Sequence, residues 1–153
     1  MWHRLNNFFH SLETYRMLRP DYASRQYVNR VLSDRPALNS EEWFKSYFQV
    51  NGITRSVATF TYHYLGKYSG LQFARVLPSD RLEEDLRWTQ VCSFDWEIML
   101  CKDFCRCFGV DIDERIYEFT FTTVEDFVVF LNCQLLQLRP ADKLREIEDM
   151  NIE

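Results

Sequence analysis

The sequence of 153 residues contains only 4 glycines and 4 prolines. So few turn-forming residues argue against an all-β fold with many tight turns and against a low-complexity chain. No run of 18 apolar residues occurs, which excludes a membrane-spanning helix. The first six residues lack the apolar stretch of a signal peptide, so we expect a cytoplasmic protein.

Cysteine occurs five times, and the odd number without an export signal favours free thiols over a disulfide framework. Cys101, Cys105 and Cys107 do not have C-x-x-C spacing, and no histidine lies near them in the sequence. We therefore expect no metal site, and we expect these three side chains to be buried as small hydrophobic groups.

The net charge of −5 is distributed unevenly. Residues 1–39 have a net charge of +3, whereas residues 40–153 have a net charge of −8. A chain that is acidic overall lacks the clustered lysine and arginine that phosphate contacts need, so no nucleic-acid partner is expected.

The chain is rich in large apolar groups, with 13 Phe, 8 Tyr and 4 Trp, and their spacing predicts helices. The predicted helices cover residues 2–18, 22–32, 41–50, 54–64, 95–108 and 122–136. Asn39 is expected to cap a helix start, Gly109 to end a helix, and residues 122–125 to form a capping box. Residues 116–122 alternate like a strand, and are expected to form an extended connection or half of a ribbon with residues 71–77.

The predicted helices place their apolar sides on a common core. We expect the core to contain Trp43, Phe60, Leu86, Ile98, Phe104, Phe108, Val124, Phe127 and Leu131. The helix over 22–32 is expected to turn Tyr22, Tyr27, Val28, Val31 and Leu32 inward.

A further apolar stripe in residues 1–39 consists of Leu5, Phe8, Phe9, Leu12 and Tyr15. A stripe of this size is not left in water. It is expected to dock on the protein's own bundle, or to form a homodimer by docking on a second copy.

The sequence contains none of the motifs that carry common enzyme chemistry. We find no Gly-rich phosphate loop, no G-x-S-x-G, no H-E-x-x-H and no C-x-x-C. The sequence therefore predicts a binding module and not an enzyme.

Three motifs of the second half resemble the acyl carrier protein family. They are Leu-Glu-Glu-Asp-Leu at 82–86, Phe-Gly-Val-Asp-Ile at 108–112 and Thr-Thr-Val-Glu-Asp-Phe at 122–127. Within that superfamily the chain looks most like a divergent enterobacterial group of carrier-like proteins of unassigned function. The resemblance implies an all-α fold, an acyl-carrier-like four-helix bundle with an N-terminal helical extension. The expected division is an extension over 1–39, the carrier-like domain over 40–136 and a polar tail over 137–153.

Members of this family carry a phosphopantetheine arm on the serine of an Asp-Ser-Leu triad at the start of helix II. The family's spacing puts that position at Phe94, and no Asp-Ser-Leu occurs in the chain. Ser93 is the nearest hydroxyl, and is either the attachment site or an ordinary helix N-cap. The neighbouring Cys92 is expected to be a buried thiol, the alternative being a reactive thiol at a helix start.

Partner enzymes of the family read the acidic surface of helix II. The corresponding residues here are Asp95, Glu97 and Asp103, with Lys102 and Arg106 interrupting the acidic face. The resemblance thus implies a carrier-like protein without a cofactor that recognises a protein partner. The alternatives are a working acyl or peptidyl carrier with 4'-phosphopantetheine on Ser93, and an immunity- or antitoxin-type protein that binds a partner.

Overall fold

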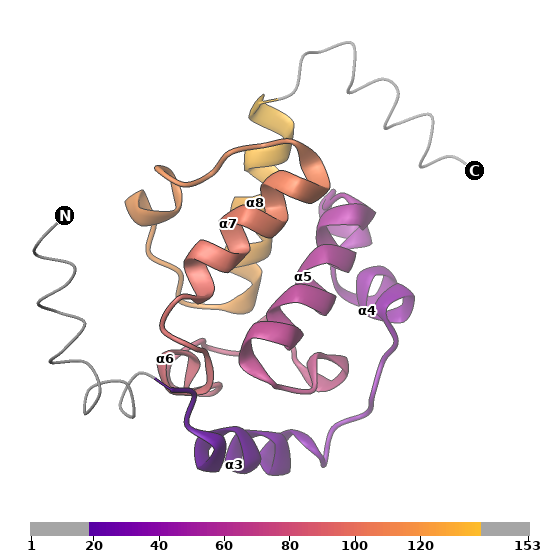
Figure 1. Cartoon of the computed structure of the whole chain (residues 1–153). Helices are drawn as coiled ribbons and strands as arrows, with labels where there is room; N and C mark the ends of the chain where they lie inside the picture. Colours follow the sequence, from indigo (N-terminus) through magenta and orange to yellow (C-terminus); the bar gives the residue numbers. More distant parts are fainter. Residues whose placement is uncertain (1–18, 139–153) are drawn as a thin grey trace, which may run out of the picture.

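The computed structural model describes residues 19–138, and these residues are all-α (Figure 1). Their six α-helices are α3 Tyr22–Leu32, α4 Ser40–Tyr47, α5 Arg55–Ser69, α6 Trp88–Val91, α7 Trp96–Phe108 and α8 Val124–Leu138. Three short 3-10 helices are η1 Gln49–Asn51, η2 Phe73–Arg75 and η3 Ile116–Glu118. The expected all-α class is confirmed for this part of the chain.

Local polar groups set several helix ends where the sequence predicts them. The Oδ1 atom of Asn39 accepts a hydrogen bond from the backbone N–H of Glu42 at 2.9 Å, and Gly109 ends α7 with a φ of 67°. The capping box of α8 lies one residue later than expected. Thr123 Oγ1 accepts from the N–H of Asp126, and the Asp126 carboxylate accepts from the N–H of Thr123.

Two predicted segments need correction. Helix α5 continues to Ser69 instead of ending at residue 64, because the left-handed residue that ends it is Gly70, with a φ of 68°. The segment 116–122 forms η3 and then an extended connection, and it does not pair with residues 71–77. Its end lies beside residues 81–82: the N–H of Leu82 donates to the Thr122 carbonyl at 2.9 Å, and Arg81 forms a β-bridge with Thr123.

The core lies between α5, α7 and α8, with α4 packed against α5 (Figure 1). The ring of Phe60 on α5 lies edge-on to Phe104 of α7, with a centroid distance of 5.4 Å. The ring centroids of Trp96 on α7 and Phe127 on α8 lie 6.1 Å apart. The nine expected core residues are buried or packed against the core with one exception, Ile98, which is exposed.

Helix α3 lies across the ends of α5 and α6 and is attached mainly by polar contacts (Figure 1). Arg25 donates from Nε to the Val91 carbonyl at 2.7 Å and from Nη2 to the Tyr68 carbonyl at 3.2 Å. These carbonyls belong to the last turns of α6 and α5, where a cation is favourable. Asn29 also donates to the Gly70 carbonyl and accepts from the N–H of Gln72.

Only part of the expected inward face of α3 is buried. Val28 and Leu32 are in the core, whereas Tyr22, Tyr27 and Val31 are exposed. The guanidinium of Arg87 instead lies over the ring of Tyr27, 4.1 Å from the ring centroid, in a cation–π contact. The stripe of Leu5, Phe8, Phe9, Leu12 and Tyr15 and the tail over 139–153 lie outside the described residues.

The connection from α3 to α4 is held to the loop that follows α5. Arg35 forms a two-pronged ion pair with the buried carboxylate of Asp80. The N–H of Leu38 donates to the Ala74 carbonyl, and the Tyr62 hydroxyl donates to the Leu38 carbonyl. The described part of the expected N-terminal extension and the connection to α4 thus make specific contacts with the segments that follow.

Candidate functional site

The turn between α6 and α7 contains the residues that the sequence singles out. Cys92 ends α6 and is buried, and Asp95 occupies the N-cap position of α7 without a side-chain capping bond. The N–H of Trp96 donates to the backbone carbonyl of Ser93 at 3.2 Å. The peptide backbone, and not a side-chain hydroxyl, therefore closes this turn.

Ser93 is half-buried, and its hydroxyl makes no hydrogen bond within residues 19–138. The expectation that Ser93 caps α7 is wrong, because Asp95 holds the cap position two residues later. Phe94, where the resemblance puts the attachment position, is 63% exposed and has no hydroxyl. The most accessible side chain at this turn is a benzyl group, which cannot carry a phosphopantetheine arm.

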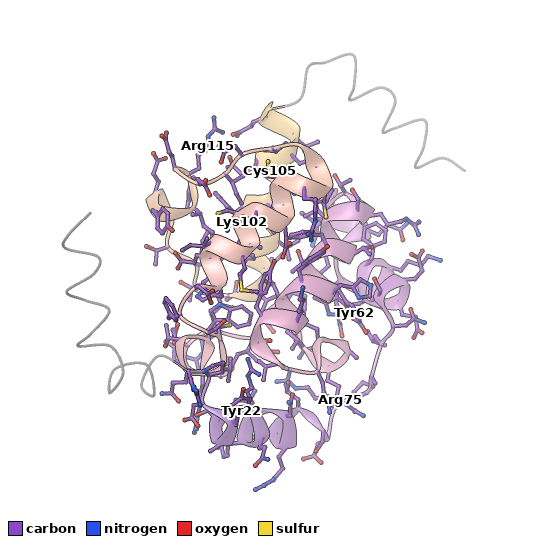
Figure 2. The ribbon with its side chains drawn as sticks, viewed as in Figure 1. Tyr22, Tyr62, Arg75, Lys102, Cys105 and Arg115 are labelled. Atoms are coloured by element: carbon purple, nitrogen blue, oxygen red, sulfur yellow. The ribbon has the colours of Figure 1, made fainter. Side chains whose placement is uncertain are left out.

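The outward side of α7 is formed by residues spaced about one helical turn apart. Phe94 precedes the helix, and Ile98, Lys102 and Cys105 follow at exposed positions. Figure 2 shows Lys102 and Cys105 along this helix. The outward side therefore combines the apolar Phe94 and Ile98 and the thiol of Cys105 with two cations, Lys102 and, one turn further on, Arg106.

The three acids expected on this surface differ in their surroundings. Asp95 and Glu97 are half-buried beside the outward side, and burial raises the pKa of Glu97. Asp103 is buried: the Tyr68 hydroxyl donates to its Oδ2 atom at 2.5 Å, and Arg106 donates to Oδ1 at 2.5 Å. Asp103 joins α5 to α7, so its placement on an exposed acidic surface is corrected.

Tyr117 of η3 is a further exposed aromatic side chain. It is 66% exposed, and its pKa is raised by burial and then by the carboxylate of Glu97. We name the set Phe94, Ile98, Lys102 and Cys105 the α7 face.

The five cysteines are all free, as the sequence predicts. Burial raises the pKa of the Cys101 thiol to about 12 and raises the pKa of Cys92 further, which contradicts a reactive thiol at Cys92. Cys105 and Cys107 are exposed, so the expectation that they are buried is wrong. Within residues 19–138, no group of side chains is arranged to hold a metal ion.

Sequence reasoning missed two features of this region. The spacing of Phe94, Ile98 and Lys102 could have indicated an outward stripe, but their apolar character assigned Ile98 to the core. It also missed a hollow of about 550 Å³ beside α8, whose walls include Phe119, Phe121 and Val129. This hollow forms because the extended connection after η3 lies along α8, a long-range arrangement that no local pattern encodes.

None of the helices in the described part of the chain is long and apolar enough to cross a membrane. Comparison of the chain with models of known protein families, with curated proteins and with solved structures finds no match.

Proposed function

We propose that this protein is an acyl-carrier-like protein that lacks a phosphopantetheine arm and acts as a protein-interaction module through the α7 face. The order of elements supports this proposal. A long helix α5, the acidic-leucine segment at 82–86, α7, the short η3 and α8 follow one another as the resemblance implies for the four helices of a carrier bundle. Helices α3 and α4 are additions to that order.

The exposure of large apolar groups on the α7 face carries the proposal. Phe94 and Ile98 are 63% and 52% exposed. Complete burial of one such side chain contributes about 1.5–3 kcal/mol, so a complex that covers both gains affinity. Clustered apolar groups on a surface mark interaction sites more often than isolated ones.

The charges around this surface favour a partner of mixed character. Lys102 lies within the α7 face, while Asp95 and Glu97 flank it. A partner with an apolar centre and both charge signs at its edge would match this arrangement. This differs from recognition by a purely basic surface, because Asp103 is buried and bonded to Tyr68 and Arg106.

The experiment compares three forms of the full chain as bait for proteins from the cells that make it. They are the wild type, the double variant Phe94→Ser/Ile98→Ser, and the control Val50→Ser. Val50 is matched because it is an apolar side chain, 92% exposed, on η1. We expect one partner to be retained by the wild type and the control and lost by the double variant. Equal retention by all three forms, or no retained partner, contradicts the proposal.

One observation favours a second candidate, a working carrier modified at Ser93. The Ser93 hydroxyl is half-buried at the start of α7 and makes no hydrogen bond to a described residue. The N-terminal end of a helix provides unpaired N–H groups and a favourable dipole for a phosphate. The variant Ser93→Ala separates the candidates, since an interaction through the α7 face survives it and an interaction through an attached arm does not.

A further inference from the structure

A groove runs along α8 beside the extended connection that follows η3. The extended connection at 119–121 forms one wall and α8 forms the other, enclosing about 550 Å³. The groove is lined by Phe119, Phe121, Val129, Phe130 and Cys133, together with the polar residues Thr120, Glu125, Asp126, Gln134 and Gln137. We name this set the α8 groove.

The aromatic walls of the α8 groove are supported from within the fold. The ring of Phe130 lies 4.9 Å from that of Phe119 and 5.1 Å from that of Phe121. Phe121 in turn contacts the buried Phe127 at 4.9 Å. The groove is therefore a formed feature of the core's edge, and yet Phe119 and Val129 remain 51% and 43% exposed.

We propose that the α8 groove binds residues 5–12 of the same chain through the apolar stripe of Leu5, Phe8, Phe9 and Leu12. The helical spacing of the stripe matches an apolar groove that accepts an amphipathic helix. Four such side chains match the apolar part of the lining, which consists of Phe119, Phe121, Val129, Phe130 and Cys133. Covering both surfaces removes two apolar patches from water at once.

The connection between the stripe and the described fold is long enough to reach the groove. The N–H of Asp21 donates to the Gln90 carbonyl in α6, the N–H of Trp88 donates to the Leu82 carbonyl, and the N–H of Leu82 donates to the Thr122 carbonyl beside Phe121. At about 5 Å for each of these three crossings, and with the short stretches of chain between them, Thr122 beside the groove lies on the order of 20 Å from Asp21. The seven residues 13–19 span up to about 24 Å when extended.

Charge and tethering favour this occupant over a second copy. Residues 1–18 have two arginines against one glutamate, while Glu125 and Asp126 lie at the groove. A segment joined to its site by a short connection experiences an effective concentration on the order of millimolar. At a micromolar protein concentration, the same segment of a second copy is far more dilute and competes poorly for the groove.

The reactivity of Cys133 tests the proposal in the full chain. Cys133 lines the groove and is half-buried, while Cys105 on the α7 face is an internal reference. Alkylation is followed by peptide mass spectrometry in the wild type, in Phe8→Ser/Phe9→Ser and in the control Asn7→Ser/His10→Ser. We expect the alkylation rate of Cys133, divided by that of Cys105, to rise at least about threefold in Phe8→Ser/Phe9→Ser. The ratio should stay unchanged in the control.

Three outcomes would overturn the proposal. One is an equal Cys133 rate in all three forms, and another is an equal rise in the control. The third is protection of Cys133 that increases with protein concentration, which assigns the groove to a second copy.

If Phe8→Ser/Phe9→Ser also makes the buried Cys92 and Cys101 reactive, the variant has lost its fold and the first test cannot be used. A second pair of variants then tests the proposal. Val129→Glu places a charge in the groove, and Val31→Glu places one at a similarly exposed position on α3. We expect trypsin to cleave after Arg4 or Arg16 faster in Val129→Glu than in Val31→Glu, and equal rates contradict the proposal. Neither variant touches the α7 face, so failure here is distinguishable from failure of the proposed function.

Discussion

Arg35 and Asp80 join the connection before α4 to the loop after α5 by two parallel hydrogen bonds. The Nη1–Oδ2 and Nη2–Oδ1 distances are 2.7 and 2.9 Å. The Asp80 carboxylate also accepts from the N–H of Leu77, and the carbonyl of Asp80 accepts from the N–H of Val124 at the start of α8. This aspartate therefore connects three segments that are distant in the sequence.

Replacing Asp80 with Asn should lower the free energy of unfolding by about 2–3 kcal/mol. The amide cannot accept both guanidinium bonds, and it leaves Arg35 partly unpaired beside buried backbone. The control Lys45→Gln removes one partner of the exposed pair with Glu41 and should cost less than about 0.5 kcal/mol. Urea unfolding measures both values, and equal costs would show that the Asp80 pair has no special role.

Gly70 offers a test of how α3 is attached. Its φ is 68°, and a Cβ atom there would lie 2.9 Å from Cδ and Nη1 of Arg25, the residue that donates to the ends of α5 and α6. Gly52 has a φ of 73° with nothing within 4 Å of such a Cβ, so it is a matched control. We expect Gly70→Ala to cost about 1–2 kcal/mol more than Gly52→Ala.

The extra cost should disappear when Arg25 is also replaced by Ala, because the steric conflict then has no partner. Four variants and their urea midpoints complete this double-mutant cycle. An extra cost that persists without Arg25 would assign the effect to the backbone of Gly70 alone.

Local sequence predicted helix ends better than helix faces. Asn39 and Gly109 act through their own backbone or through groups three residues away, so their roles can be read from the sequence. The end of α5 was predicted too early, at residue 64; the helix passes through Gly66 and ends at Gly70, whose φ is 68°.

The positions of individual side chains depended on tertiary contacts. Ile98 was expected in the core and is exposed, whereas Asp103 was expected on the surface and is buried. Asp103 is retained in the interior because Tyr68 of α5 donates to it, a contact between residues 35 positions apart. No spacing rule within α7 could have predicted that partner.

The ionisation of Glu97 should make the free energy of unfolding depend on pH. Burial raises its pKa in the folded state above the ordinary value of 4.5, so the folded protein holds this proton more tightly than the unfolded chain. The contribution of protonated Glu97 to the free energy of unfolding is fully present below pH 4.5, and it is lost as the pH rises through the raised pKa. Glu97→Gln should therefore stabilise the protein at neutral pH and have no effect well below pH 4.5.

Urea unfolding of the wild type and Glu97→Gln across this pH range measures the effect. A loss of stability at neutral pH would contradict the account, because it would mean that the charged carboxylate has a favourable partner.

The cysteines should fall into two classes of reactivity. Cys105 and Cys107 are exposed, whereas Cys92 and Cys101 are buried with raised pKa values. At about pH 8, alkylation of the native protein should modify Cys105 and Cys107 quickly and Cys92 and Cys101 only at the rate of unfolding. Peptide mass spectrometry over time checks this, and rapid modification of Cys92 would contradict its burial.

We propose that this protein is carrier-like and works without an arm, and the intact mass of the full chain tests this proposal most directly. The chain is incubated with coenzyme A and a broad-specificity phosphopantetheinyl transferase, with an ordinary acyl carrier protein in the same tube as the positive control. We predict that the control gains the mass of phosphopantetheine and that this chain does not, because Phe94 stands where the proposed resemblance puts the attachment position. A gain of one phosphopantetheine that Ser93→Ala abolishes would contradict the proposal and identify a working carrier.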